Sequence, residues 1–158
     1  NLKGSVRSDL KKAAKNVQIE REDFQAPPIF ALYSSILPRK GRKVPCLPTV
    51  FERLHKVLQD KAQSVCFTAR GKHMGELCGG LYLCFDNRAA SVLFCAVEPH
   101  WQHTCALHAL FWEAVQWAGS RGLLLDFEGS MDPGLEAIFR SFGGQMVPYF
   151  SVWKAFVF

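Results

Sequence analysis

The spacing of apolar and polar residues divides the chain into an N-terminal part with helical periodicity and a later part with extended periodicity. In residues 5–15, alanines and basic residues recur three and four positions apart, which predicts a short helix with a cationic face. Residues 17–22 alternate and predict a brief strand. Apolar residues return at helical spacing in residues 27–37 and 49–62, so we expect two further helices joined by a proline-rich, basic loop.

Three extended segments follow, and short polar turns separate them. Strand-like composition is found in residues 64–70, 73–86 and 89–97. The short connections between these segments predict an antiparallel meander. Gly79 and Gly80 interrupt the second strand, which indicates a β-bulge or the close approach of another part of the protein.

The C-terminal third mixes both periodicities. Residues 104–122 carry a broad apolar face at helical spacing and end on a glycine, so a long helix is expected there. The apolar run at 123–127 predicts a strand buried on both faces. Residues 132–142 predict a helix, and residues 145–158 predict one or two strands. This order of elements predicts a mixed α/β (α+β) fold with a largely antiparallel sheet flanked by helices.

The length of the chain favours one domain of ordinary size. With 158 residues, of which 49% are hydrophobic, one core is expected. We therefore expect residues 1–158 to form a single domain, in which residues 1–62 are helical and basic and residues 63–158 hold the sheet and the long helix. No apolar run approaches about 18 to 20 residues and no leader pattern opens the sequence, so we expect a soluble protein without a membrane span. Because the first residue is not methionine, three further alternatives stay open: a fragment, a processed form, or the ordered half of a longer protein.

The cysteines have no C-x-x-C pair, and most lie in apolar, strand-like segments: Cys46, Cys66, Cys78, Cys84, Cys95 and Cys105. Free buried thiols explain this pattern better than a disulfide framework or a zinc site, since both alternatives show regular spacing. Free thiols persist in a reducing compartment, so we expect a cytoplasmic protein.

Positive charge is concentrated in two segments, and the net charge is +5. Arg7, Lys11 and Lys15 repeat every four residues and share one side of the first helix, where they can hold phosphate groups of a nucleotide-linked substrate or of tRNA. The alternative is a solvated helix face. Residues 39–43 form a second basic cluster, which is either a phosphate site or an ordinary loop. Nothing in the sequence resembles a reader of DNA sequence.

Two sequence blocks carry a family resemblance. The segment "LLLDFEGSMDPGLEAIFRSFGG" resembles the closing block of FemAB-like transferases, and "SVRSDLKKAAKNV" resembles their basic opening. The order of elements resembles the acyltransferase fold of the GNAT superfamily. FemAB-like proteins usually contain two GNAT-like halves, and this chain resembles the C-terminal half, so the resemblance implies one half of a longer tandem protein.

The resemblance implies an N-acyltransferase that moves an acyl or aminoacyl group from acyl-CoA or aminoacyl-tRNA to the amine of a small molecule or peptide. Acyl-CoA enzymes of this kind carry a Q/R-x-x-G-x-G/A loop that holds pyrophosphate, whereas this chain has "HWQHTCAL" there. The lysine of the bridge-forming "F-K-x-x-F-G" segment corresponds to Phe139, with Arg140 beside it as a candidate for substrate binding. The alternative is a non-catalytic GNAT-like module that binds tRNA, a nucleotide or a protein partner.

Two carboxylates follow the predicted strand at 123–127, where the resemblance places the substrate cleft. Asp126 and Glu128 are two residues apart, so they would share one face of a strand, and either can take a proton from the attacking amine or bind its ammonium form. The alternative is that they accept N–H groups of the following turn. Tyr149 lies where many GNAT relatives have a tyrosine that protonates the leaving group. Glu98, which ends the strand before the long helix, is a minor candidate base.

No metal is expected at the histidines. His103 and His108 are five residues apart and would fall on different faces of a helix, although Cys105 lies between them. The apolar segment 151–158 can pair with a second copy of the chain, so a homodimer is a further expectation.

Overall fold

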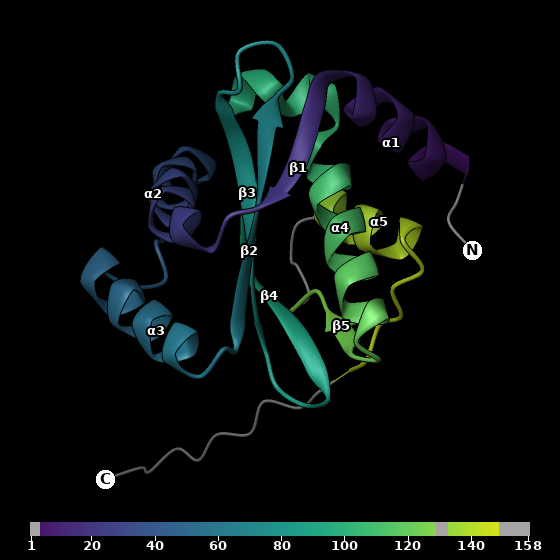
Figure 1. The fold of residues 1–158 in the computed structure, drawn as a ribbon. Coiled ribbons are helices and arrows are strands. Elements are labelled where there is room, and N and C mark those ends of the chain that lie inside the picture. Colours follow the sequence, from purple (N-terminus) through teal and green to yellow (C-terminus); the bar gives the residue numbers. More distant parts are fainter. Residues whose placement is uncertain (1–3, 129–132, 149–158) are drawn as a thin grey trace, which may run out of the picture.

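The computed structural model describes residues 4–128 and 133–148. One five-stranded sheet runs through the middle of the molecule, with helices packed on both of its faces (Figure 1). The strands are β1 (Val17–Arg21), β2 (Ser64–Gly71), β3 (Leu77–Phe85), β4 (Ala89–Val97) and β5 (Leu124–Asp126). The α-helices are α1 (Gly4–Asn16), α2 (Ala26–Ile36), α3 (Pro48–Asp60), α4 (Ala106–Ser120) and α5 (Pro133–Ser141). Short 3-10 turns occupy Asp23–Gln25, Pro38–Lys40 and Pro99–Thr104.

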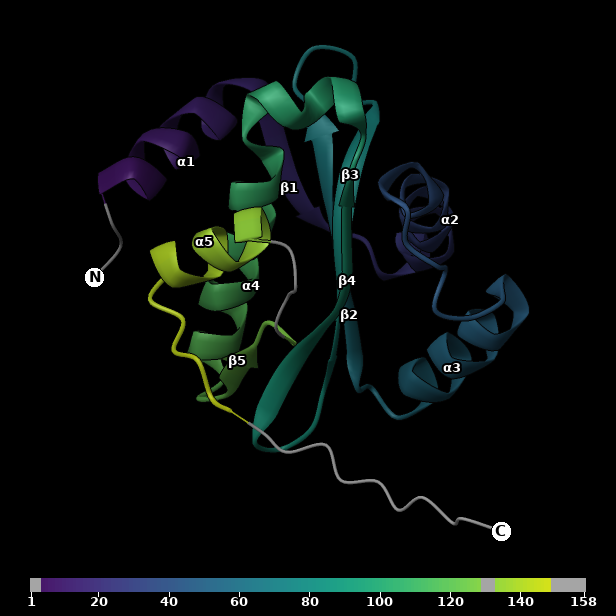
Figure 2. The same ribbon diagram turned by 180° about the vertical axis from the view of Figure 1, so that it is seen from behind.

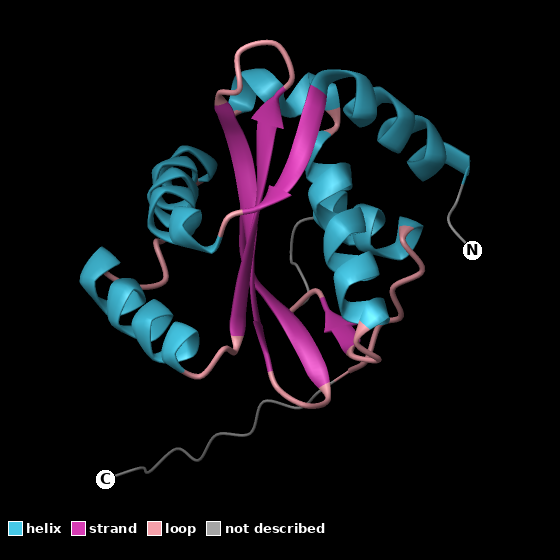
Figure 3. Cartoon of the chain, viewed as in Figure 1, coloured by secondary structure: helices cyan, strands magenta, loops and turns pink. Residues whose placement is uncertain are grey.

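The strands lie in the sheet in the same order as in the sequence. Strands β1 to β4 are antiparallel to their neighbours, and β5 joins β4 in parallel after the α4 crossover. Helices α2 and α3 cover one face, and α1, α4 and α5 cover the other, as the two opposite views show (Figures 1 and 2). The mixed, largely antiparallel sheet predicted from the sequence is confirmed, and Figure 3 shows how the extended segments alternate with helices.

Each face of the sheet has its own core. Leu81 and Leu83 face the α4 side, where they pack with Leu110 and Phe111 of that helix. The α2 and α3 side is aromatic, and it includes Phe30, Phe51, Tyr82 and Phe94. The ring centroids of Phe30 and Phe51 lie 4.4 Å apart, and those of Tyr82 and Phe94 lie 5.3 Å apart. Burial on both faces explains why β2 and β3 read as nearly continuous apolar runs.

Gly79 and Gly80 show both features that the sequence predicted. The pairing of β2 with β3 shifts next to Gly79: Ala69 pairs with Gly79, but Arg70 pairs with Leu77, so Cys78 is the extra residue of a β-bulge. A Cβ atom on Gly79 would lie 2.4 Å from the carbonyl oxygen of Ala96, and one on Gly80 would lie 2.7 Å from the Ile29 side chain. The absence of side chains therefore lets β3 approach β4 and α2 closely.

The strand expected at 123–127 is shorter and more exposed than predicted. The expectation of burial on both faces is wrong, because 75% of Leu124 is exposed and only alternate residues of β5 face α4. Within the described part of the chain β5 is the last strand of the sheet, so one of its edges is unpaired. Residues 145–148 contain no strand, and residues 149–158 lie outside the described residues.

The six cysteines are free thiols, as expected. Within residues 4–128 and 133–148, no helix is long and apolar enough to cross a membrane.

Candidate active site

Strands β4 and β5 separate after the first third of β4. Their parallel pairing covers only Ala89 with Leu124, Ala90 with Leu125, and Ser91 with Asp126. Strand β4 then continues to Val97, and within the described residues no other strand lies along that side of it. The backbone N–H and C=O groups on this edge are therefore available to a ligand.

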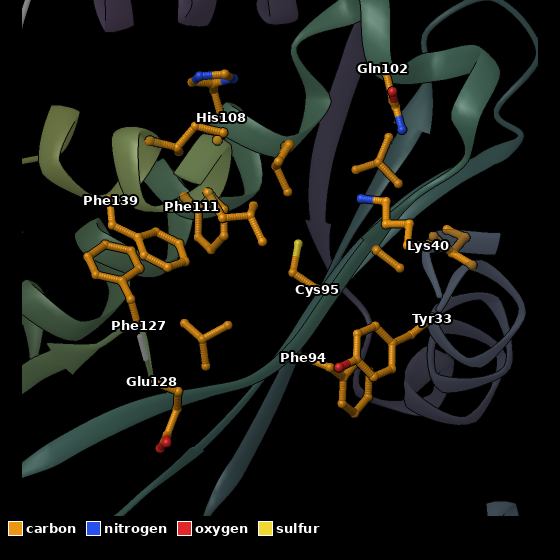
Figure 4. A pocket seen from close by; sticks show the side chains of 18 of the residues that line it. Tyr33, Lys40, Phe94, Cys95, Gln102, His108, Phe111, Phe127, Glu128 and Phe139 are labelled. Atoms are coloured by element: carbon orange, nitrogen blue, oxygen red, sulfur yellow. The ribbon is translucent and has the colours of Figure 1, made fainter. Parts of the chain in front are cut away.

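A cavity of about 580 Å³ follows the open edge of β4 (Figure 4). Both helical layers contribute to it, so it lies across the opening of the sheet rather than on one face. The residues that line it include Tyr33, Lys40 and Arg42 from α2 and the loop after it, Leu93 to Cys95 from β4, Gln102, Cys105, Leu107 and His108 at the start of α4, and Phe127, Glu128 and Phe139.

A β-bulge lies in the part of β4 that faces the cavity. Tyr82 of β3 pairs with Phe94, whereas the next residue, Leu83, pairs with Val92, so Leu93 is the extra residue. Leu93 is 39% exposed and lines the cavity. A bulge turns backbone groups out of the ladder, and an N–H group directed at a cavity can stabilise an oxyanion.

The N-terminal end of α4 forms another wall. Cys105 precedes the helix with φ of +62°, a left-handed conformation that glycine adopts more readily than other residues. In the Q/R-x-x-G-x-G/A pattern Gln102 takes the first position and Cys105 takes that of the first glycine, so a conformation that favours glycine occurs here at a cysteine. Trp101 and His103, the bulky residues of this loop, do not line the cavity. The positive end of the α4 dipole and its first N–H groups remain available to an anion.

The two predicted carboxylates have different surroundings. Glu128 lines the cavity, and its φ of +60° ends the extended conformation of β5. Asp126 is not among the lining residues, and its Oδ1 accepts the backbone N–H of Glu128 at 2.7 Å. This contact is the turn-stabilising role that the sequence offered as the alternative. Phe127, between them, stacks on Phe139 with 4.6 Å between the ring centroids.

The predicted phosphate-binding residues do not gather at the cavity. Arg7, Lys11 and Lys15 are exposed on α1 and are not lining residues. Arg140 lies on α5, where its guanidinium pairs with Glu136 at 2.6 Å. Tyr149 lies outside the described residues.

The second basic cluster, by contrast, reaches the cavity through Lys40 and Arg42. In Figure 4 the Lys40 amine and the Tyr33 hydroxyl point inward. Burial raises the pKa of Tyr33, and the nearby charge of Arg42 opposes this rise. Sequence reasoning treated Tyr33 only as part of an apolar helical stripe, and no local spacing marks it as a residue of a cavity.

His108 and Cys105 share a contact with Asp9 of α1. His108 Nε2 lies 3.5 Å from one Asp9 carboxylate oxygen, and the Cys105 thiol donates to the other at 3.6 Å. Burial lowers the pKa of His108 more than Asp9 raises it, and burial together with Asp9 raises the pKa of Cys105. Both groups are therefore uncharged near neutral pH. Across the residues that the structure covers, no cluster of His, Cys, Asp and Glu is arranged to hold a metal ion.

The largely antiparallel sheet, which opens beside β4 and has helices on both faces, agrees with the fold that the sequence resemblance implied. The sequence comparison is more specific, because residues 1–133 match the family model described as acetyltransferase (GNAT) domain. The chain therefore belongs to the GNAT acetyltransferase family, a family of enzymes. No curated protein sequence matches the chain significantly.

Solved structures share the fold. An aminoglycoside antibiotic 6'-N-acetyltransferase from Acinetobacter baumannii is 14% identical with a TM-score of 0.64, over 89% of this chain and 99% of that one. An aminoglycoside acetyltransferase from an uncultured soil metagenomic sample, in complex with sisomicin, is 20% identical with a TM-score of 0.63, over 89% and 99% of the two chains. FemX is 14% identical with a TM-score of 0.75, over 90% of this chain and 54% of its own, so the present chain spans about half of FemX.

Proposed function

We propose that this chain is an N-acyltransferase that moves an acyl group from acyl-CoA to an amine in the cavity between β4 and β5. The observation that carries the proposal is that one cavity brings together the bulged, unpaired edge of β4, the N-terminus of α4 and the carboxylate of Glu128. Family membership supports the class of reaction.

The cavity favours acyl-CoA over aminoacyl-tRNA as the donor. The arm of acyl-CoA contains amide groups between its thioester and its phosphates, and such groups can pair with an open strand edge like that of β4. The α4 N-terminus is suited to the phosphates. The cationic face of α1, which would suit tRNA, is not part of the cavity lining.

The reaction needs a base, an oxyanion site and a route for a proton to the leaving group. The neutral amine nitrogen attacks the thioester carbonyl carbon, the N–C bond forms, and the C–S bond breaks to release the CoA thiolate. Glu128 accepts the proton that the amine loses, and the β4 bulge supplies an N–H group for the developing oxyanion. The thiolate takes a proton from a phenol or from solvent, for which Tyr149 and Tyr33 are the two candidates.

A non-catalytic module that binds its ligand in the same cavity is the second candidate. Cys105 favours it, because a side chain occupies the position at which the acyl-CoA loop has a glycine. Release of CoA from acetyl-CoA in the presence of simple amines separates the two candidates. We expect Glu128→Gln to lower kcat by about 100-fold while the affinity for acetyl-CoA and the melting temperature stay unchanged.

The matched control is Glu136→Gln, because Glu136 pairs with Arg140 on α5 and is not a lining residue. It should leave kcat unchanged. Binding of acetyl-CoA without acyl transfer to any amine would favour the binding module.

The likeness to FemX also supports a tandem arrangement, in which residues 1–158 are one GNAT unit and a longer protein supplies another. The free thiols support a cytoplasmic location. Equilibrium sedimentation of the purified chain tests the homodimer that the segment 151–158 suggested.

A further inference from the structure

The charged side chains that line the cavity differ between its two ends. Among the described lining residues, Lys40 and Arg42 carry positive charge and Glu128 carries negative charge, while His108 is held neutral by burial. Figure 4 shows Lys40 and Glu128 at opposite ends of the cavity. A ligand that fills the cavity therefore meets cations at one end and a carboxylate at the other.

The cationic end is held in place by backbone hydrogen bonds. The N–H groups of Lys40 and Arg42 both donate to the carbonyl of Leu37, at 3.0 Å each. Leu37 itself is buried, with only 7% of its surface exposed. Gly41, between the two cations, has φ of +66°, and its N–H group donates to the carbonyl of Pro38 at 3.0 Å, which closes the turn. The side chains of Lys40 and Arg42 thus start from a fixed turn rather than from an open loop.

The two cations lie on the side of the sheet away from α4. They follow α2, which covers one face, whereas the α4 N-terminus and α5 approach the cavity from the other face (Figures 1 and 2). The anion-binding helix end is thus available to the donor phosphates from one side. Lys40 and Arg42, which follow α2, are thus placed to contact a second ligand that enters the cavity from the opposite side of the sheet.

We propose that the amine acceptor also carries an anionic group, a carboxylate or a phosphate, which Lys40 and Arg42 bind while its amine lies toward Glu128. This inference rests on the proposed function and extends it to the acceptor. Positive charge at the entry side repels polycations. Aminoglycosides, the substrates named for two proteins of similar fold, are therefore poor acceptors here.

The test measures acceptor binding by calorimetry to the protein saturated with CoA, and acyl transfer from acetyl-CoA in parallel. One matched pair is glucosamine 6-phosphate and glucosamine, and the other is β-alanine and its methyl ester. Sisomicin is the polycationic probe. We expect the anionic member of at least one pair to bind about tenfold more tightly than its neutral partner and than sisomicin. The pair that shows the difference distinguishes phosphate from carboxylate.

Charge reversal locates the effect. Lys40→Glu and Arg42→Glu should each remove the preference for the anionic member, whereas Lys43→Glu, in the same loop but outside the cavity lining, should preserve it. Tighter binding of sisomicin than of both anionic probes overturns the inference, as does failure of every probe to bind at millimolar concentration. So does a loss of acetyl-CoA affinity in Lys40→Glu with acceptor preference unchanged, since the cations would then serve the donor. If anionic probes bind preferentially but none is acylated, the inference stands and the proposed reaction fails.

Discussion

Asp9 and His108 tie the first helix to the helix that opens onto the cavity. The carboxylate of Asp9 on α1 lies 3.5 Å from Nε2 of His108 on α4, and the His108 side chain also lines the cavity. Burial lowers the pKa of His108 in spite of this neighbour, so the imidazole is neutral in the folded protein at pH 7. The contact therefore holds α1 against the site without requiring a buried positive charge.

The lowered pKa of His108 predicts acid sensitivity. At a pH above 6.5, the ordinary pKa of histidine, the His108 imidazole is neutral in both the folded and the unfolded protein, so its burial does not lower the free energy of unfolding. As pH falls below that value the unfolded chain binds a proton first, and the free energy of unfolding decreases until the folded pKa is reached. His55, whose pKa burial also lowers, adds to the same trend. Thermal melts between about pH 7.5 and about pH 5.5 measure the slope.

The His108→Gln variant should give a flatter dependence of Tm on pH than the wild type. His73→Gln is the control, because His73 is exposed in the turn between β2 and β3 and its replacement should leave the slope unchanged. An unchanged slope in His108→Gln would contradict the prediction.

Gly79→Ala should destabilise the protein by about 2 kcal/mol or more. The new methyl group would meet the carbonyl oxygen of Ala96, a backbone atom that cannot rotate away. Gly119→Ala is a control of opposite sign, since nothing lies within 4 Å of its Cβ position and alanine is the better helix former. Urea unfolding of the two variants should give midpoints on opposite sides of the wild type.

Cys105→Gly should be more stable than Cys105→Ala by about 0.5 to 1 kcal/mol. Both variants lose the thiol contact with Asp9, but only glycine adopts φ of +62° without strain. The same change restores a glycine at the α4 N-terminus, so acetyl-CoA should bind more tightly to the glycine variant. Equal stability of the two variants would show that the left-handed conformation costs nothing here.

In the proposed mechanism, tyrosine replacements identify the residue that donates a proton to the CoA thiolate. If the cavity hydroxyl of Tyr33 serves, Tyr33→Phe lowers kcat by about tenfold or more, and Tyr149→Phe leaves it unchanged. The reverse result assigns the role to Tyr149. Tyr82→Phe is the control, because the Tyr82 hydroxyl contacts Nδ1 of His55 at 2.8 Å and is not among the cavity-lining residues. It should reduce stability and spare kcat.

The sequence predicts the elements of this protein better than the members of its site. Alternation and helical spacing located the helices and the meander because these patterns reflect which face of each element is buried. Gly79 and Gly80 also predicted correctly that another part of the protein approaches β3 closely, since a strand residue without Cβ leaves room for such a contact.

Asp126 shows where such reasoning stops. Asp126 and Glu128 would share one face only if the strand continued through Glu128. Instead the chain turns at Glu128, and the Asp126 carboxylate accepts the backbone N–H of that residue. Tyr33 and Lys40 are at the site because the end of α2 and the loop after it lie along β4, and no spacing in the sequence encodes that contact between distant elements. The exposed face of β5 was missed for a similar reason, since an apolar run does not reveal which strand lies at the edge.

The way in which β5 joins the sheet bears on how the protein folds. Strands β2, β3 and β4 are connected by short turns and can pair early, whereas β5 must wait for α4 to form and cross over. The cavity beside β4 depends on that late step, so it is completed after the central sheet. Amide hydrogens of β5 should exchange with solvent before those of β3, and a bound substrate should slow exchange in β5 most.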